Sequence, residues 1–240
     1  MKRFIALLLC LIMVFTLVGC TKTGQEDTQS STLLVGFGRT DITPQFSVRL
    51  GGYGGSENRW SNNVLDPLYA TAMAFTDAEG NTVITIQLDM CTTSTSEIPF
   101  IRKKISKQHD ISIDNIYVYA THSHSTPRIQ GDEPAIVKYK EFMEEQMLAA
   151  VEAALADRKP AQMYTVTTTV NYVNFVRHYR MDDGSVVGDN FGDDTGKSYV
   201  KHVKDADNSM QLVRFKREGG KDILLVNWQC HPIRTGGGTK

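Results

Sequence analysis

The stretch Asn115–Ser125, NIYVYATHSHS, joins a β-strand pattern to the residues that most clearly suggest chemistry. Its first seven residues are rich in β-branched and aromatic side chains, which is typical of a strand. His122 and His124 follow directly and are separated by one residue. Because residues two apart in an extended chain project to the same face, we expect both imidazoles to point the same way. Such a pair can bind one metal ion, or one histidine can bind it while the other serves a substrate. Ordinary surface or core histidines remain the alternative interpretation.

Two further polar residues stand at the ends of apolar strands. Asp89 ends the run Ile84–Asp89, ITIQLD, and His231 follows the run VNWQC. In α/β sheets, ligand sites gather at the carboxyl ends of strands, and zinc sites use imidazole and carboxylate groups. The pattern therefore favours a metal site, while a helix cap for Asp89 and a packed or exposed His231 remain open.

The surrounding pattern alternates strands with two helices. Turn clusters that contain glycine, at 77–81 and 217–221, each lie between two strand patterns, which predicts two hairpins. The helices are expected over 96–108 and 133–157, each with a proline in its first turn, and the second carries an apolar stripe from Val137 to Leu155. We therefore predict an α/β fold, a layered domain with mixed β-sheets flanked by helices. In all, strands are expected over 33–39, 69–76, 82–89, 115–121, 162–176, 210–216 and 223–229.

The first 31 residues have the pattern of a targeting segment. A basic start, Met1-Lys2-Arg3, precedes the apolar run 4–18 and then Leu17-Val18-Gly19-Cys20. This resembles a bacterial lipobox, so we predict a lipoprotein signal peptide over 1–19, lipidation of Cys20 and a polar, flexible tether over 20–31. The mature protein is then expected to be lipid-anchored outside the cytoplasm. An ordinary signal peptide with an incidental Cys20 is the alternative.

Composition excludes several other classes. The chain has 240 residues with 26 Lys+Arg against 27 Asp+Glu, which does not suggest a nucleic-acid binder. Gly36-Phe37-Gly38 lacks the third glycine of a dinucleotide loop, because Asp41 stands in its place.

Cys91 and Cys230 are expected as buried thiols, with a disulfide between them as the alternative. The acidic region 182–207 is expected to be a solvated loop, with substrate contact or a weak cation site as alternatives.

Six segments in order resemble the N-terminal catalytic domain of neutral/alkaline (non-lysosomal) ceramidases. Together they span about 200 residues, nearly all of the expected mature chain. The segments are 35–44 (VGFGRTDITP), 51–54 (GGYG), 66–70 (DPLYA), 88–89 (LD), 120–125 (ATHSHS) and 227–232 (NWQCHP).

The resemblance implies a Zn²⁺-dependent amide hydrolase that cleaves an N-acyl sphingoid lipid into fatty acid and sphingoid base. On that basis His122 and His231 are the zinc ligands, and His124 lies beside the metal as a catalytic residue. Arg177 is assigned to catalysis and substrate binding, and Tyr53 to substrate binding. The family's asparagine before that arginine is replaced here by Val176.

Asp89 is expected to support a ligand from outside the metal's own ligand shell. The family's remaining zinc ligands, a glutamate and a tyrosine, are expected beyond residue 240, so the domain 32–240 is predicted to be incomplete at its C-terminus. The alternative function is a non-catalytic lipid- or glycan-binding surface lipoprotein. A solute-binding lipoprotein of an importer fits the signal but not the histidines, and the sequence does not indicate an oligomeric state.

Overall fold

The structure is a computed structural model that describes residues 33–53, 58–93, 97–188 and 196–231. The predicted signal peptide 1–19, the tether 20–31 and Cys20 lie outside the described residues. The described strands are β1 (Leu34–Asp41), β2 (Tyr69–Thr76), β3 (Thr82–Leu88), β4 (Ile116–Ala120), β5 (Lys159–Thr169), β6 (Tyr179–Met181), β7 (Val186–Val187), β8 (Tyr199–His202), β9 (Ser209–Arg217) and β10 (Ile223–Trp228). The described helices are α2 (Glu97–His109), the short 3-10 helix η1 (Ile113–Asn115) and α3 (Pro134–Ala156).

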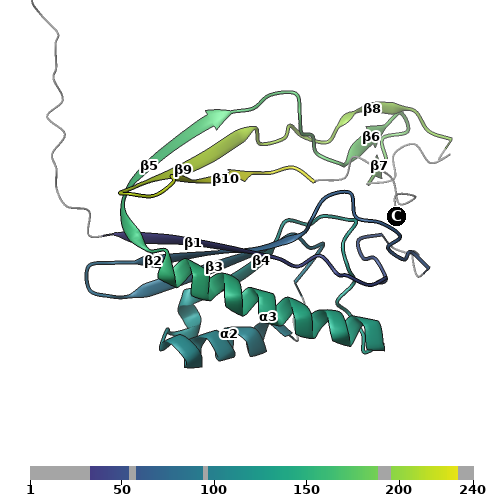
Figure 1. The fold of residues 1–240 in the computed structure, drawn as a ribbon. Coiled ribbons are helices and arrows are strands. Elements are labelled where there is room, and N and C mark those ends of the chain that lie inside the picture. Colours follow the sequence, from purple (N-terminus) through teal and green to yellow (C-terminus); the bar gives the residue numbers. More distant parts are fainter. Residues whose placement is uncertain (1–32, 54–57, 94–96, 189–195, 232–240) are drawn as a thin grey trace, which may run out of the picture. The chain divides into compact units, whose positions relative to one another are not determined.

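Seven of these strands form one mixed sheet in the order β10-β9-β5-β1-β2-β3-β4. Neighbouring strands are antiparallel except for β3 and β4, which are parallel. A parallel pair needs a crossover connection, and α2 supplies it (Figure 1). Both predicted hairpins, β2–β3 and β9–β10, are present. The predicted class, a layered α/β domain with a mixed sheet and flanking helices, is confirmed.

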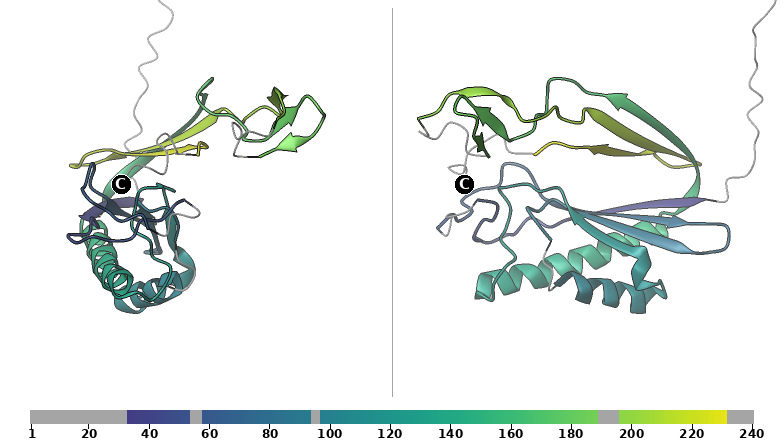
Figure 2. Two further views of the ribbon diagram at one scale, coloured as in Figure 1. Left: turned by 90° about the vertical axis from the view of Figure 1, so that its right-hand side faces the viewer. Right: turned by 180° about the vertical axis from the view of Figure 1, so that it is seen from behind.

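The sheet bends between β1 and β5, so that its strands lie in two layers. Strand β1 pairs with β2 along its whole length, but only two residue pairs join β1 to β5. Strands β1–β4 carry α2 and α3 on one side, and β5, β9 and β10 lie over their other side (Figures 1 and 2). Buried apolar residues from both layers form a second core cluster between them, comprising Val35, Met73, Ala161, Phe215 and Ile223.

Helix α3 packs directly on the backbone of β1, and this explains the two glycines that resemble a dinucleotide loop. A Cβ atom on Gly36 would lie 1.9 Å from the Ala154 carbonyl oxygen, and one on Gly38 would lie 2.1 Å from that of Ala150. Since real Cβ atoms never approach an oxygen so closely, only glycine fits at these positions. The face of α3 that packs there carries small residues, Ala150 and Ala154, both fully buried.

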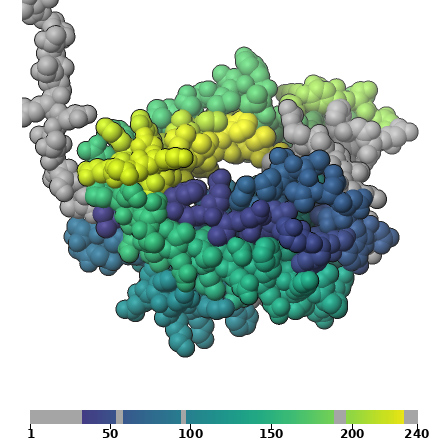
Figure 3. All heavy atoms as spheres, in the orientation of Figure 1, coloured from purple at the N-terminus to yellow at the C-terminus, as the bar shows by residue number. Residues whose placement is uncertain are grey.

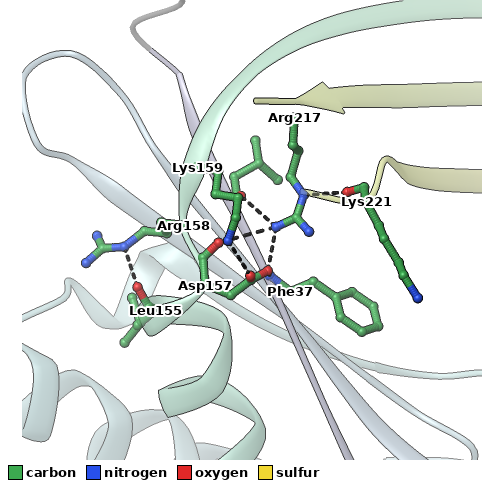
Figure 4. A network of polar contacts seen from close by, with 8 residues as sticks. Phe37, Leu155, Asp157, Arg158, Lys159, Arg217 and Lys221 are labelled. Atoms are coloured by element: carbon green, nitrogen blue, oxygen red, sulfur yellow. Dashed lines mark hydrogen bonds and ion pairs between the residues drawn. The ribbon is translucent and has the colours of Figure 1, made fainter. Parts of the chain in front are cut away.

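A polar network fastens the two layers where α3 gives way to β5 (Figure 4). The Asp157 carboxylate accepts a hydrogen bond of 2.5 Å from Arg217 Nη1 on β9. It also accepts bonds from Lys159 Nζ and from the Phe37 backbone N–H of β1. The Arg217 side chain is only 6% exposed, so its charge depends on this partner. Asp157 therefore connects α3, β1, β5 and β9 at one point.

Three expectations from the sequence are corrected. Strand β5 covers 159–169 instead of 162–176, and the segment after Thr169 leaves the sheet. The region 182–207 is not a simple loop, because β7 and β8 within it pair with β6 in a separate three-stranded sheet. Val137 is 37% exposed, because the buried face of α3 begins at Ile136, Tyr139 and Met143. Met147, Val151 and Ala154 of the predicted stripe are buried.

Within the part of the chain that the structure describes, no helix is both long enough and apolar enough to cross a membrane.

Replacing Asp157 with Asn should destabilise the fold in a pH-dependent way. Partial burial alone would raise the pKa of Asp157, but the hydrogen bonds from Arg217, Lys159 and Phe37 together hold it below its ordinary value of 3.8. Because the pKa of Asp157 is lower in the folded than in the unfolded state, its ionised carboxylate stabilises the folded state at pH values above the unfolded-state pKa. This contribution is lost as the pH falls through the folded-state pKa. We expect Asp157→Asn to lower the free energy of unfolding by about 2 kcal/mol at neutral pH.

Urea denaturation measured from neutral pH to about pH 2 checks this, and the difference from wild type should shrink as the carboxyl group protonates. Asp222→Asn is the matched control, because Asp222 pairs with the exposed Arg214, and we expect this substitution to change the free energy of unfolding much less than Asp157→Asn does. A difference that is the same at neutral and acid pH contradicts the role given to Asp157.

Candidate metal centre

The His-x-His motif lies in a loop directly after β4, and its geometry differs from the one expected. His122 has φ = 64°, in the left-handed region that non-glycine residues rarely adopt. The extended backbone assumed for this motif is therefore wrong, because a left-handed turn at His122 precedes His124. Such a conformation costs on the order of 1–3 kcal/mol and is concentrated at functional sites. The two rings nevertheless come together, as expected, with their Nε2 atoms 3.2 Å apart.

The buried residue Thr126 holds this loop in place. Its hydroxyl group donates to the Ser123 carbonyl oxygen at 3.2 Å and accepts from the Cys91 backbone N–H at 3.0 Å. The bond to Cys91 ties the loop to the segment that follows β3, since Cys91 lies three residues beyond the last residue of that strand. Neighbouring tertiary contacts therefore stabilise the strained turn.

Three imidazoles converge at this loop. His122 Nε2 lies 3.1 Å from His231 Nε2 and 3.2 Å from His124 Nε2. The ring centroids are 4.6–4.9 Å apart, and each pair of rings meets edge to face. His231 comes from the segment after β10, whereas His122 and His124 follow β4. The structure thus brings together the three histidines that the sequence singled out.

The hydrogen bonding of His122 indicates what can occupy the point of convergence. Its Nδ1 lies 2.6 Å from the Cys91 carbonyl oxygen. Because a carbonyl only accepts, Nδ1 carries the proton, and the neutral ring presents a lone pair at Nε2. One lone pair cannot accept two good hydrogen bonds from His124 and His231 at once, but a cation can bind several such nitrogens. A metal-ligating histidine typically donates its other N–H to a carbonyl in this way, so the donor set fits a divalent metal ion that favours imidazole.

Cys91 also lies at the site, which the sequence did not indicate. Its Sγ is 3.9 Å from His122 Nδ1, and Cys91, His122 and His124 form a group that could hold a metal. Burial raises the pKa of the Cys91 thiol, which disfavours the thiolate that binds metals. Both Cys91 and Cys230 are free thiols, so the alternative of a disulfide between them is wrong. Cys91 is only half-buried and Cys230 is exposed, so the prediction of two buried thiols is wrong as well.

Asp89 makes different contacts from those of a residue that orients a histidine. Its carboxylate accepts from the Tyr69 backbone N–H at 3.1 Å, and its own N–H donates to the Tyr69 carbonyl at 3.0 Å. The His122 ring instead bonds to the carbonyl oxygen of Cys91, which lies two residues after Asp89 in the sequence. Asp89 therefore fixes the end of β3 against β2, and its predicted support of a metal ligand stays a prediction.

Tyr53 and Arg59 form one wall of the site. The Tyr53 ring meets the His124 ring edge to face at 5.2 Å, and the Arg59 guanidinium lies over the Tyr53 ring at 4.7 Å. Arg59 is only 6% exposed and donates to the carbonyl oxygens of Gly51 and His124, both at 3.3 Å. Tyr53 was predicted; Arg59 was not, because no motif marks an isolated arginine whose partners are distant backbone carbonyls.

Arg177 also acts on His124. Burial lowers the pKa of His124 most, and electrostatic interactions with the His122 ring and with the Arg177 and Arg59 guanidinium groups lower it further, while the Gly52 backbone opposes them. The charge of Arg177 thus reaches His124, while its predicted roles in catalysis and substrate binding stay predictions. Gly52 itself packs against His124: a Cβ there would lie 2.7 Å from the His124 Cα, and its φ of 104° suits glycine.

A pocket of about 570 Å³ adjoins the motif through Ser123 and Ser125, the residues that alternate with His124. This volume lies within the ordinary range for small-molecule sites. Its apolar lining includes Phe46, Val48, Leu50 and Leu65. Figure 3 shows a hollow in the surface between the yellow β10 and the purple β1.

The fold and the histidine cluster together define a layered α/β domain with a candidate metal site. The family model for the N-terminal domain of neutral/alkaline non-lysosomal ceramidases matches residues 33–234. Because this match covers most of the sequence, the chain belongs to that family. No curated protein gives a significant match to the chain.

Two solved structures resemble the fold. They are a ceramidase complexed with C2 and the neutral ceramidase from Pseudomonas aeruginosa. Each has a TM-score of 0.60 and 16% sequence identity, and the alignment covers 80% of this chain but 30% of the solved chain. The chain therefore spans less than a third of the length of these ceramidases, and at this identity the likeness concerns the fold.

Replacing Arg59 with Lys should weaken metal binding. Lysine keeps the charge but loses the planar fork that reaches two carbonyls and the face that stacks on Tyr53. We expect a loss of about 1–2 kcal/mol in the free energy of unfolding and several-fold weaker binding of Zn²⁺, used as a probe in competition with a chromogenic chelator. Arg39→Lys is the control, because exposed Arg39 stacks on Tyr69 away from the histidines. Equal Zn²⁺ affinities for Arg59→Lys and wild type contradict this role.

Proposed function

We propose that this protein is a zinc-dependent amide hydrolase that cleaves an N-acyl sphingoid lipid into a fatty acid and a sphingoid base. Membership of the ceramidase family supports the reaction class. The observation that carries the proposal is the convergence of three Nε2 atoms, one of which belongs to His122, whose tautomer is fixed by the Cys91 carbonyl. His122 and His231 are the proposed zinc ligands. Bound zinc would act as a Lewis acid toward the amide carbonyl and lower the pKa of water to about 7.

His124 is the proposed proton carrier. Burial and nearby positive charges lower its pKa, so that its imidazole is neutral at pH 7. A neutral imidazole can take a proton from attacking water and then donate it to the leaving amine. The Tyr53 ring and the Arg59 bond to the His124 carbonyl hold this residue in place. Precise placement matters because proton transfer requires hydrogen-bond distance.

Arg177 is the proposed electrostatic partner of the reacting carbonyl group. Its guanidinium offers a permanent positive charge to the oxygen that becomes negative as water adds to the amide. The same charge suits the carboxylate of the fatty-acid product. Tyr53 and the apolar residues of the neighbouring pocket provide surface for the lipid. A lipid amide is therefore the substrate class that these groups support best.

The proposal is tested with the full chain loaded with one zinc ion per molecule. We expect release of sphingosine from N-acylsphingosine, and loss of activity after removal of the metal with a chelator. His122→Ala and His231→Ala should each weaken zinc binding by more than about tenfold. His109→Ala, on α2, is the matched control and should leave both quantities unchanged.

Hydrolysis that survives complete metal removal would contradict the mechanism. Tight zinc binding with lipid binding but no hydrolysis would instead favour the alternative, a non-catalytic lipid-binding protein.

We further propose that the chain is a lipoprotein anchored through Cys20 on the outer side of a bacterial membrane. The basic, apolar and lipobox-like order of residues 1–20 supports this. Cys20→Ala should abolish incorporation of labelled palmitate and release the protein from the membrane fraction, whereas Cys10→Ala should not. Palmitate labelling that persists in Cys20→Ala would overturn the anchor.

A further inference from the structure

Arg177 lies in the segment 170–178, which connects β5 to β6 and has no regular secondary structure. An arginine side chain has many rotamers, so its backbone must be held firmly if the guanidinium is to stay near His124. The contacts that hold this backbone come from β8, which belongs to the separate three-stranded sheet.

Two hydrogen bonds hold the carbonyl groups of the residues that flank Arg177 in the sequence, Val176 and His178. The Val176 carbonyl oxygen lies 2.8 Å from Nδ1 of His202, the last residue of β8. The His178 carbonyl accepts from the Val203 backbone N–H at 2.9 Å. Since the Val176 carbonyl can only accept, His202 carries its proton on Nδ1. Neighbouring residues at the end of β8 thus bind the carbonyls before and after Arg177.

The ring of His202 is itself held in position. It is half-buried, with the Phe175 ring at 5.3 Å and the Tyr179 ring at 5.2 Å between centroids. Phe175 and Tyr179 belong to the same part of the chain as Arg177, on either side of it. His202 therefore contacts this segment through one hydrogen bond and two ring faces, which restricts its rotamer.

A second set of bonds ties the same segment to the end of β10. Asn174 Nδ2 donates to the Asp207 carbonyl at 3.0 Å and to the Gln229 carbonyl at 3.1 Å. Gln229 Nε2 also donates to the Asp207 carbonyl, at 2.9 Å. Gln229 precedes the proposed zinc ligand His231 by two residues. The segment that carries Arg177 is thus fixed both to β8 and to the strand end that delivers His231.

We propose that His202 is a positioning residue that holds Arg177 where its guanidinium can bind a carboxylate or a developing oxyanion at the candidate metal centre. The identity of the ligand that Arg177 binds rests on the function proposed above. His202 itself touches neither metal nor substrate. The small sheet β6–β8, which the sequence did not predict, then stabilises the backbone of the segment 170–178 that carries Arg177.

The contact between His202 and the segment 170–178 is tested first, without metal or substrate. Hydrogen exchange of peptides covering residues 173–179 should be at least about tenfold faster in His202→Phe, which keeps a ring but loses the donor. His202→Asn, whose amide nitrogen stands near the position of Nδ1, should restore slow exchange. His109→Phe is the matched control and should leave these peptides unchanged. Equal exchange in wild type and His202→Phe overturns the proposal.

The consequence for Arg177 is tested with sodium dodecanoate as the probe, bound to the zinc-loaded chain below its micelle concentration. Arg177→Ala should weaken binding about tenfold, and His202→Phe should approach that loss while zinc affinity and melting temperature stay unchanged. His202→Asn should lie within about twofold of wild type. The double variant Arg177→Ala/His202→Phe should bind as weakly as Arg177→Ala alone, because His202 acts through Arg177.

Two outcomes overturn the positioning role of His202. In the first, the losses of dodecanoate affinity add up in the double variant. In the second, Arg177→Ala binds dodecanoate more weakly but His202→Phe binds it as tightly as wild type. Failure of the proposed function has a different signature: the wild-type chain then binds neither zinc nor dodecanoate, while the hydrogen-exchange result still decides whether His202 holds the segment.

Discussion

The bend of the sheet between β1 and β5 is the constraint on which the candidate site depends. His122 follows β4 and His231 follows β10, and these are the two opposite edges of the seven-stranded sheet. In a flat sheet, strands lie almost 5 Å apart, so the two edges would be about 30 Å from each other. Their Nε2 atoms instead lie 3.1 Å apart. The sheet can fold in this way because only two residue pairs connect β1 to β5.

Packing on both sides of the bend makes it specific. Gly36 and Gly38 allow α3 to lie directly on β1, which fixes the layer that carries the His-x-His loop. Asp157, at the end of the same helix, receives Arg217 from the other layer. Small changes at this junction would be magnified at the far ends of the strands, where the histidines meet. The packing of α3 therefore helps to set how the two layers, and the histidines at their ends, lie relative to each other.

Much of this arrangement could be predicted from the sequence. The hairpins follow from turn residues between strand patterns, and α3 from its proline at the start and its apolar stripe. The convergence of His122 and His231 could be proposed because both follow strands, and the resemblance to ceramidases identified the same pair. The predicted family is confirmed by the match over 33–234.

Other features depend on tertiary contacts that leave no local signal. The left-handed turn at His122 is stabilised by Thr126 and the Cys91 segment, which are distant in sequence from one another. Arg59 binds the His124 carbonyl across 65 positions of the chain. Strands β6–β8 have between two and four residues each, too few for a period to be recognised.

Zinc X-ray absorption spectroscopy of the full chain tests the central claim most directly, because it reports the atoms bound to the metal. The convergence of His122 and His231 predicts a first shell of nitrogen or oxygen at about 2.0–2.1 Å with the multiple scattering of at least two imidazoles. Replacing either histidine with alanine should remove one imidazole from this signal. A shell dominated by sulfur at about 2.3 Å, or a spectrum without imidazole scattering, would contradict the site described above.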